Sequence, residues 1–222
     1  LDLIRDYPDV RHVIISSCSV YGHTDDAATE ATEVRPLTAY AQAKAWVDYN
    51  APLIAENVIS LRLGTVWGYS PGHRLDLVVN RMMFDAIHKG VVTVSGSSWR
   101  PLVHIEDVAA AITHYAENDV VGVYNIVGDN AQMDDLGTLI AEYAEVNVEQ
   151  HPETPDKRDY TAASEYVTEH SVFNEDDLHD LWVNTQLLPV LFPNPEDRYT
   201  RLNSIRRLKN LGLLDYDLRR IA

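Results

Sequence analysis

The chain has 222 residues and carries 34 Asp and Glu against 18 Lys and Arg, which gives a formal net charge of −16 and a pI of about 4.8. It has no basic stripe that could neutralise phosphates, which argues against nucleic-acid binding. Its single cysteine cannot form an internal disulfide, as fits a reducing, cytoplasmic location, and no apolar run is long enough to span a membrane.

Apolar periodicity predicts an alternation of helices and strands, which favours an α/β fold. Residues 58–63 are apolar enough to form a strand buried on both faces, as is typical of parallel sheets. Thr38 has the side chain of an N-cap for the helix that follows it. The predicted helices cover residues 1–6, 39–55, 76–89, 106–117, 134–145 and 176–189, and the predicted strands cover residues 11–16, 58–63, 91–95 and 122–127.

The stretch from Ser16 to Lys44 carries the chemistry. Ser17 lies at the carboxyl end of the first strand, and Tyr40 and Lys44 share one face of the next helix. A free tyrosine is a poor base at neutral pH, but an ammonium one turn away favours the phenolate. With a serine to hold a substrate oxygen, these groups can move hydride on or off a carbinol carbon. The pair alone is a weak motif, and an exposed helix pair is the alternative.

Four motifs follow one another in a fixed order. They are SSCSVYG at 16–22, PLTAYAQAK at 36–44, LRLGTVWG at 61–68 and RPLVHIEDVA at 100–109. The series closely resembles the extended short-chain dehydrogenase/reductases, the NAD-dependent epimerase/dehydratase family that acts on nucleotide sugars. The resemblance covers roughly residues 8–145 and resumes weakly near the C-terminus.

The resemblance implies the C-terminal part of a doubly wound parallel Rossmann sheet with a small substrate-binding lobe. We expect residues 1–67 and 104–145 to belong to the NAD-binding domain, and residues 68–103 and 146–222 to the substrate side. Nothing in the chain matches the Gly-rich phosphate turn that opens such a fold, so we expect the N-terminal Gly-rich half to be absent. The implied cofactor is NAD, and we expect a homodimer.

The family pattern assigns catalytic and cofactor roles residue by residue. Tyr40 would remove the proton from a sugar hydroxyl as hydride leaves the same carbon for NAD. Lys44 would activate Tyr40 and hold the nicotinamide ribose, while Ser17 would fix the sugar oxygen. Leu63 and Gly64, at a strand's carboxyl end, would lie beside the nicotinamide.

The implied substrate is a nucleotide-diphosphate sugar. Besides Ser17, the candidate contacts are Thr65, which stands where the family often has asparagine, and Asn80, for which a polar group facing solvent is the alternative. Arg100 resembles the arginine that grips the diphosphate, a role suited to its guanidinium fork. Arg198 is a second phosphate contact or a surface arginine. No metal-ligand spacing is present, so we expect no metal site.

The two residues after Ser17 narrow the choice of reaction. Dehydratases and decarboxylases of the family usually place a carboxylate two or three residues after the catalytic Ser or Thr, whereas this chain has Cys18 and Ser19. We therefore expect a nucleotide-sugar epimerase. A 4-ketoreductase or dehydratase of the same family, or a truncated fragment that binds a sugar or partner without turnover, are the alternatives.

The charge also suggests an environment. Lysine is scarce, and arginine supplies most of the positive charge. Acid-rich, lysine-poor surfaces keep proteins soluble where salt screens repulsion. We hypothesise a halophilic source, with an ordinary acidic cytosolic protein as the alternative.

Overall fold

The computed structural model describes residues 1–70, 73–150 and 158–187 of the chain. The helices are α1 (Asp2–Asp6), α2 (Ala39–Asn50), α3 (Val78–Lys89), α4 (Ile105–Glu117), α5 (Met133–Ala144) and α6 (Glu175–Gln186), with 3-10 turns η1 (Cys18–Tyr21) and η2 (Ala51–Leu53). The strands are β1 (His12–Ser17), β2 (Val58–Leu63), β3 (Thr65–Trp67), β4 (Val91–Val94), β5 (Trp99–His104), β6 (Gly122–Ile126), β7 (Asp129–Gln132) and β8 (Asn147–Gln150). The expected α/β class is confirmed.

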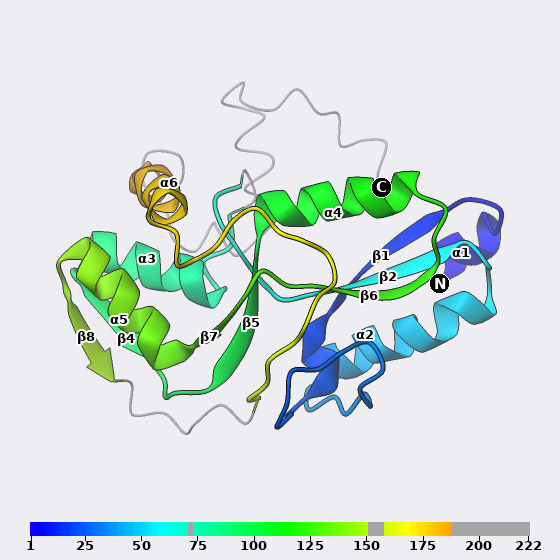
Figure 1. Cartoon of the computed structure of the whole chain (residues 1–222), viewed down its shortest axis with the longest axis horizontal. Coiled ribbons are helices and arrows are strands. Elements are labelled where there is room, and N and C mark those ends of the chain that lie inside the picture. The colour runs from blue at the N-terminus through cyan, green and yellow to red at the C-terminus, as the bar shows by residue number, and fades with distance from the viewer. Residues whose placement is uncertain (71–72, 151–157, 188–222) are drawn as a thin grey trace.

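The first part of the molecule is a parallel sheet in the order β1-β2-β6. Ser17 pairs with Leu63, and Leu63 pairs with Ile126, so the three strands end at the same edge. Helix α2 covers one face of this sheet and α4 the other (Figure 1). Every residue of β2 is buried, which confirms the strand predicted to be covered on both faces.

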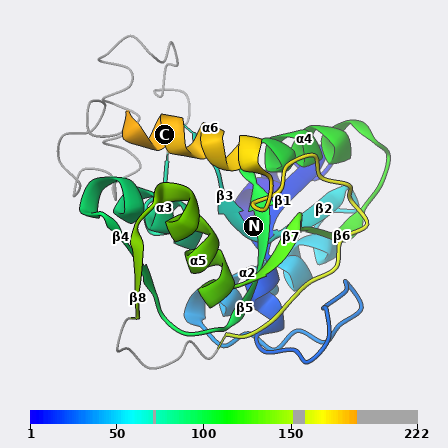
Figure 2. The ribbon, with the colours of Figure 1, turned by 60° about the vertical axis from the view of Figure 1, so that its left-hand side comes forward.

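The second part holds a separate apolar core. Strands β4 and β8 pair in parallel beside α3, α5 and α6 (Figure 2). Helix α5 packs in this core although it directly follows β7. The buried apolar residues of this core are Trp67, Val79, Met82, Met83, Ala86, Val92, Val94, Leu102, Ala131, Met133, Leu136, Ile140, Ala141, Val172, Leu178 and Leu181. Within the described ranges no helix has the length and apolarity needed to cross a membrane.

A second small sheet, β3-β5-β7, joins the two parts, and two glycines let it form. A Cβ on Gly64, between β2 and β3, would lie 3.0 Å from the carbonyl carbon of Leu102 in β5. Gly68 has a φ of +101°, and a Cβ there would overlap with Nε2 of His104. Gly68 therefore requires a residue without a side chain, and at Gly64 a side chain would press on the backbone of β5.

Residues 158–174, which we call the strap, cross the region where the two parts meet (Figure 1, yellow). On one side, the backbone N–H of Ala28 donates to Thr161 O and the N–H of Ala163 donates to Ala28 O, each at 2.9 Å. On the other side, the amide of Asn130 bonds both backbone groups of Ala162, at 2.9 and 3.0 Å. The strap is thus held between the loop after β1 and strand β7.

Carboxylates from separate elements hold the far end of the strap. Asp107, in the first turn of α4, accepts the backbone N–H groups of Glu169 and His170 at 2.9 and 3.2 Å. Asp129 in β7 accepts the N–H of Val172 at 2.8 Å. These bonds satisfy backbone donors that no regular secondary structure would pair.

Several element boundaries differ by one to a few residues from those predicted, among them the end of α2 and the start of α3. Helix α2 ends at Asn50, because Pro52 opens the 3-10 turn η2 where the helix was expected to continue to residue 55. Helix α3 begins at Val78, after Leu77 as its N-cap, instead of at Asp76.

Candidate functional site

The carboxyl end of β1 and the first turn of α2 lie at the same end of the parallel sheet (Figure 1). Ser17 is the last residue of β1, and Tyr40 is the second residue of α2. Thr38 is the N-cap of α2, as predicted, and its hydroxyl accepts the N–H of Ala41 at 3.1 Å. The cap fixes where the helix starts and so where Tyr40 leaves the backbone.

Tyr40 and Lys44 lie one turn apart on α2. The Lys44 ammonium donates to the backbone carbonyl of Ile15 in β1 at 2.6 Å and lies 5.6 Å from the centroid of the Tyr40 ring. Tyr40 is 58% exposed. The lysine thus anchors the helix to β1, while the phenol next to it is open to a ligand.

Ser17 is half-buried and oriented by the turn that follows it. Its Oγ accepts the N–H of Ser19 at 3.2 Å, which makes Ser17 the N-cap of η1, and it donates to Ser19 Oγ at 2.9 Å. The bonds give the Ser17 hydroxyl a defined direction at the strand end.

A buried polar network lies below this strand end. Asp48 in α2 and Arg62 in β2 form an ion pair at 2.9 Å, with side chains only 4% and 8% exposed. Ser16 donates to the same carboxylate oxygen at 2.9 Å. Arg62 donates to the Tyr21 hydroxyl at 3.0 Å, and that hydroxyl donates to the Asn125 side chain at 2.7 Å. Ser16, Tyr21 and Arg62 lie within two of the four motifs, but the motifs do not reveal how these residues pair, because their partners come from distant segments.

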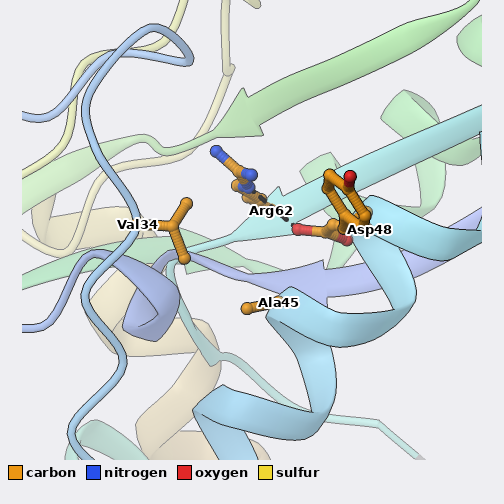
Figure 3. A pocket seen from close by; sticks show the side chains of 5 residues that line it. Val34, Ala45, Asp48 and Arg62 are labelled. Carbon is orange, nitrogen blue, oxygen red and sulfur yellow. Dashed lines mark hydrogen bonds and ion pairs between the residues drawn. The ribbon is translucent and has the colours of Figure 1, made fainter.

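A pocket of about 340 Å³ opens beside this network. Figure 3 shows the Arg62 guanidinium and the Asp48 carboxylate meeting at its wall. The remaining lining residues are Val34, Ala45 and Tyr49.

The predicted cofactor contacts lie at the carboxyl end of β2. Leu63 is its last residue and is 6% exposed, and the N–H of Gly64 donates to Ile126 O at 3.0 Å. Thr65, a predicted substrate contact, is the half-buried first residue of β3.

The other predicted substrate contacts lie farther along the chain. Asn80 is 3% exposed; its oxygen accepts the N–H of Gly68 at 3.1 Å, and its nitrogen donates to Arg74 O at 3.1 Å. Arg100 is 8% exposed, and its guanidinium donates to Trp99 O at 2.6 Å and faces the strap. Arg198 lies outside the described residues, and diphosphate binding by all three stays a prediction.

Arg74 was not predicted as part of the site. Its guanidinium donates to Asp76 at 3.0 Å, and this bond, together with the charges of Asp76 and of the Tyr40 phenol, raises the pKa of Arg74. The loop before α3 therefore shares its charge environment with the start of α2. Only the folded chain reveals this, because the loop and the start of α2 are distant in sequence.

His104, Glu106 and His170 are the described residues that come nearest to a metal site, with one ligand atom from each within 4.8 Å of the others. His104 Nδ1 accepts the N–H of Glu106 at 3.4 Å as the N-cap of α4, and its Nε2 lies against Gly68. The Nδ1 bond to the start of α4 and the close packing of the ring against Gly68 support a structural role for His104.

The fold is similar to those of solved nucleotide-sugar enzymes. A dTDP-glucose 4,6-dehydratase from Bacillus anthracis str. Ames, in complex with NAD, matches 88% of this chain with a TM-score of 0.72 and 20% identity. MoeE5, in complex with UDP-glucuronic acid and NAD, matches 83% with a TM-score of 0.73 and 24% identity. A UDP-glucose 4-epimerase from Thermus thermophilus, in complex with NAD, matches 83% with a TM-score of 0.70 and 20% identity.

At these identities the likeness shows a shared fold, the Rossmann architecture predicted from the motifs. The chain spans 66%, 68% and 67% of the lengths of those three structures, so it corresponds to about two thirds of each.

The family assignment comes from the sequence itself. The family model described as "NAD dependent epimerase/dehydratase family" matches residues 1–127, which is more than half of the chain. This range contains the whole β1-β2-β6 sheet and both helices that cover it. The resemblance predicted from the four motifs is confirmed, and the chain belongs to the NAD-dependent epimerase/dehydratase family.

Proposed function

We propose that the protein is an NAD-dependent oxidoreductase of the epimerase type that acts on a nucleotide-diphosphate sugar. The observation that carries this proposal is the exposed Tyr40 phenol, one turn from Lys44, at the carboxyl end of β1. Ligands of parallel α/β sheets bind at that edge. Family membership and the NAD complexes of the similar structures support the same conclusion.

The residues at this edge fit a nicotinamide cofactor. Lys44 offers an ammonium and Tyr40 a hydroxyl, which suit the hydroxyls of a ribose, and Leu63 and Gly64 offer a buried, apolar strand end. When bound, NAD supplies the acceptor and later the donor of hydride.

The chain's own residues handle the proton and the sugar oxygen. Tyr40 takes the proton of the sugar hydroxyl. It returns the proton after the keto sugar has rotated to present its other face. Lys44 lies one turn away, with its ammonium 5.6 Å from the centroid of the Tyr40 ring. Ser17, whose O–H points to Ser19 Oγ in this structure, would exchange that bond for one to the oxygen that becomes a carbonyl.

The environment of Cys18 and Ser19 favours epimerisation over elimination. Cys18 is fully buried, its thiol donates to Arg62 O at 3.1 Å, and burial raises the pKa of that thiol. The Ser19 hydroxyl is bonded to Ser17. Neither group supplies the carboxylic acid that loss of water would need. A ketoreductase is distinguished by its steady consumption of reduced cofactor, whereas an epimerase recycles NAD.

We also propose a homodimer, because α2 leaves Trp46 and Tyr49 exposed at 58% and 74%, and the adjoining turn η2 leaves Leu53 exposed at 71%. Such apolar exposure is typical of protein interfaces. Sedimentation velocity measures the mass directly, and a monomer at all concentrations would contradict this proposal.

The test of the function uses Tyr40→Phe in the protein expressed from its complete gene. With NAD bound, UDP-glucose and UDP-glucuronic acid are the first probes, and formation of the 4-epimer is followed by NMR. Removal of the phenol should lower kcat by about 10²- to 10⁴-fold, since a positioned acid–base group contributes that much. Tyr7→Phe is the control and should keep wild-type kcat, because Tyr7 follows α1 outside the site and is exposed to the same degree, 57%. Equal turnover by Tyr40→Phe and wild type would refute the assignment.

A further inference from the structure

We propose that Asp48 is a positioning residue that holds the Tyr40 helix and the Ser17 turn in register, an inference that rests on the proposed function. Tyr40, Lys44 and Asp48 follow one another at intervals of four residues on α2, so they share one face. Tyr40, at the start of this face, is 58% exposed, whereas Asp48, near its end, is 6% exposed. The face thus carries a reactive group at one end and a buried carboxylate at the other.

The Asp48 carboxylate joins α2 to two strands next to their functional ends. One oxygen, Oδ2, accepts Ser16 Oγ–H and Arg62 Nε–H, both at 2.9 Å. Ser16 immediately precedes Ser17, and Arg62 immediately precedes Leu63. A shift of this carboxylate would therefore move the helix relative to both predicted contacts.

The network also holds the turn that orients Ser17. Arg62 donates to the hydroxyl of Tyr21, the last residue of η1, at 3.0 Å. Ser17 is the N-cap of this same turn. Asp48 therefore acts on the start of η1 through Ser16 and on its end through Arg62.

Close packing does not hold Asp48 by itself. Its other oxygen, Oδ1, is buried without a hydrogen bond from any described residue, and Asp48 lines the 340 Å³ pocket of Figure 3. A pocket of this size has room for water beside the carboxylate. The orientation of Asp48 thus depends on the two donors at Oδ2, and removing one of them should loosen the site.

The experiment compares Ser16→Ala with Ser60→Ala. Both serines are buried, at 2% and 1% exposure, on paired strands, but the Ser60 hydroxyl makes no hydrogen bond within the described part of the chain. With NAD and the UDP-sugar probe that the wild type turns over, Ser16→Ala should lower kcat by about ten- to hundredfold, as small misplacements do, with KM unchanged. Ser60→Ala should keep wild-type kcat.

A second readout does not depend on turnover. Ser16→Ala should speed amide hydrogen exchange across η1, including the Ser19 N–H, whereas Ser60→Ala should not. Asp48→Asn should show the same two effects more strongly, and Asp85→Asn is its control, because Asp85 is equally buried and paired with Arg81 but lies in α3.

The outcomes separate the two proposals. If wild type turns over the probe and Tyr40→Phe does not, but Ser16→Ala behaves like Ser60→Ala in both readouts, the positioning role is wrong and the proposed function stands. If Tyr40→Phe and wild type are equal, the proposed function fails and the positioning role fails with it.

Discussion

At the scale of single residues, glycines determine how closely the segments around the site can approach. Gly68 follows β3, where its backbone adopts a φ of +101° and lies against the His104 ring. Gly90, after α3, also has a positive φ, +69°, but a Cβ there would meet nothing within 4 Å. Substitution at Gly90 would therefore cause backbone strain alone, whereas substitution at Gly68 would cause backbone strain and steric overlap.

Gly68→Ala should therefore lower the free energy of unfolding by about 3 kcal/mol or more, because overpacking adds to the cost of the backbone conformation. Gly90→Ala should cost only about 1 kcal/mol, the price of a left-handed alanine alone. Urea unfolding measures both. Equal losses in the two variants would show that the Gly68–His104 contact relaxes without cost.

The residues found from sequence were those whose signal is local. Tyr40 and Lys44 are one helical turn apart and Ser17 ends an apolar strand, but it was the four ordered motifs that led to their assignment, and their catalytic roles stay predictions. The Asp48–Arg62 pair and the electrostatic interaction of Arg74 with the phenol were not predicted, because the partners come from different elements and leave no periodic signal.

At the scale of elements, a pair of stacked histidines joins the strap to the end of β5. His104 and His170 lie with ring centroids 4.3 Å apart, and Asp107 contacts His170 Nδ1 at 3.2 Å. Burial and the nearby charge of His170 lower the pKa of His104. Desolvation opposes protonation of His170, but the hydrogen bond and charge of Asp107 outweigh it and raise the pKa of His170.

The two shifts have opposite consequences for stability. The unfolded-state pKa of each is near 6.5. Neutral His104 contributes fully above that pH, and its contribution is lost as the pH falls below 6.5. His170 contributes fully below 6.5, and its contribution is lost as the pH rises through its raised folded-state pKa. Together the two histidines stabilise the folded strap most strongly near pH 6.5.

His104→Asn should flatten the loss of stability on the acid side, because asparagine keeps the N-cap but does not titrate. His170→Gln should flatten the loss on the alkaline side. Urea midpoints measured across pH, relative to wild type, check both signs, with His23→Asn as an exposed control. Parallel pH curves for wild type and both variants would contradict the assignment.

The predictability of the elements followed their length and period. The helices after residue 38 have clear periodicity and were located to within a few residues, as were the strands of the parallel sheet. Strands β3, β7 and β8 have only three or four residues, too few to show a period. The six-residue strand β5 was also not predicted, and Pro101 within it argues against a strand. The path of the strap depends on Asn and Asp side chains that bind distant backbone, so its own sequence did not predict it.

At the scale of the whole molecule, the net charge of −16 is the dominant electrostatic feature. Repulsion among like charges opposes compactness and is screened over about 10 Å at 0.1 M salt and about 3 Å at 1 M. The scarcity of lysine leaves few partners that could offset this repulsion locally. The halophilic origin proposed from composition depends on this balance.

The thermal unfolding midpoint should therefore rise as KCl is increased from about 0.1 M to about 1 M. Chloride is preferred to sulfate, because sulfate also strengthens apolar burial and would confuse the two effects. Sucrose is excluded from the protein surface but screens no charge, so it is the control for stabilisation that does not depend on charge screening. Stability as high in dilute buffer as in molar salt would count against the halophilic proposal.

The burial of Cys18 gives the protein a built-in reporter. It is the chain's one cysteine, and it is fully shielded by the elements that carry Ser17 and Arg62. An alkylating dye can react with it only in molecules that have opened at the strand end, and each opened molecule gains one label. The rate of labelling therefore measures how often this region opens in the unmodified protein.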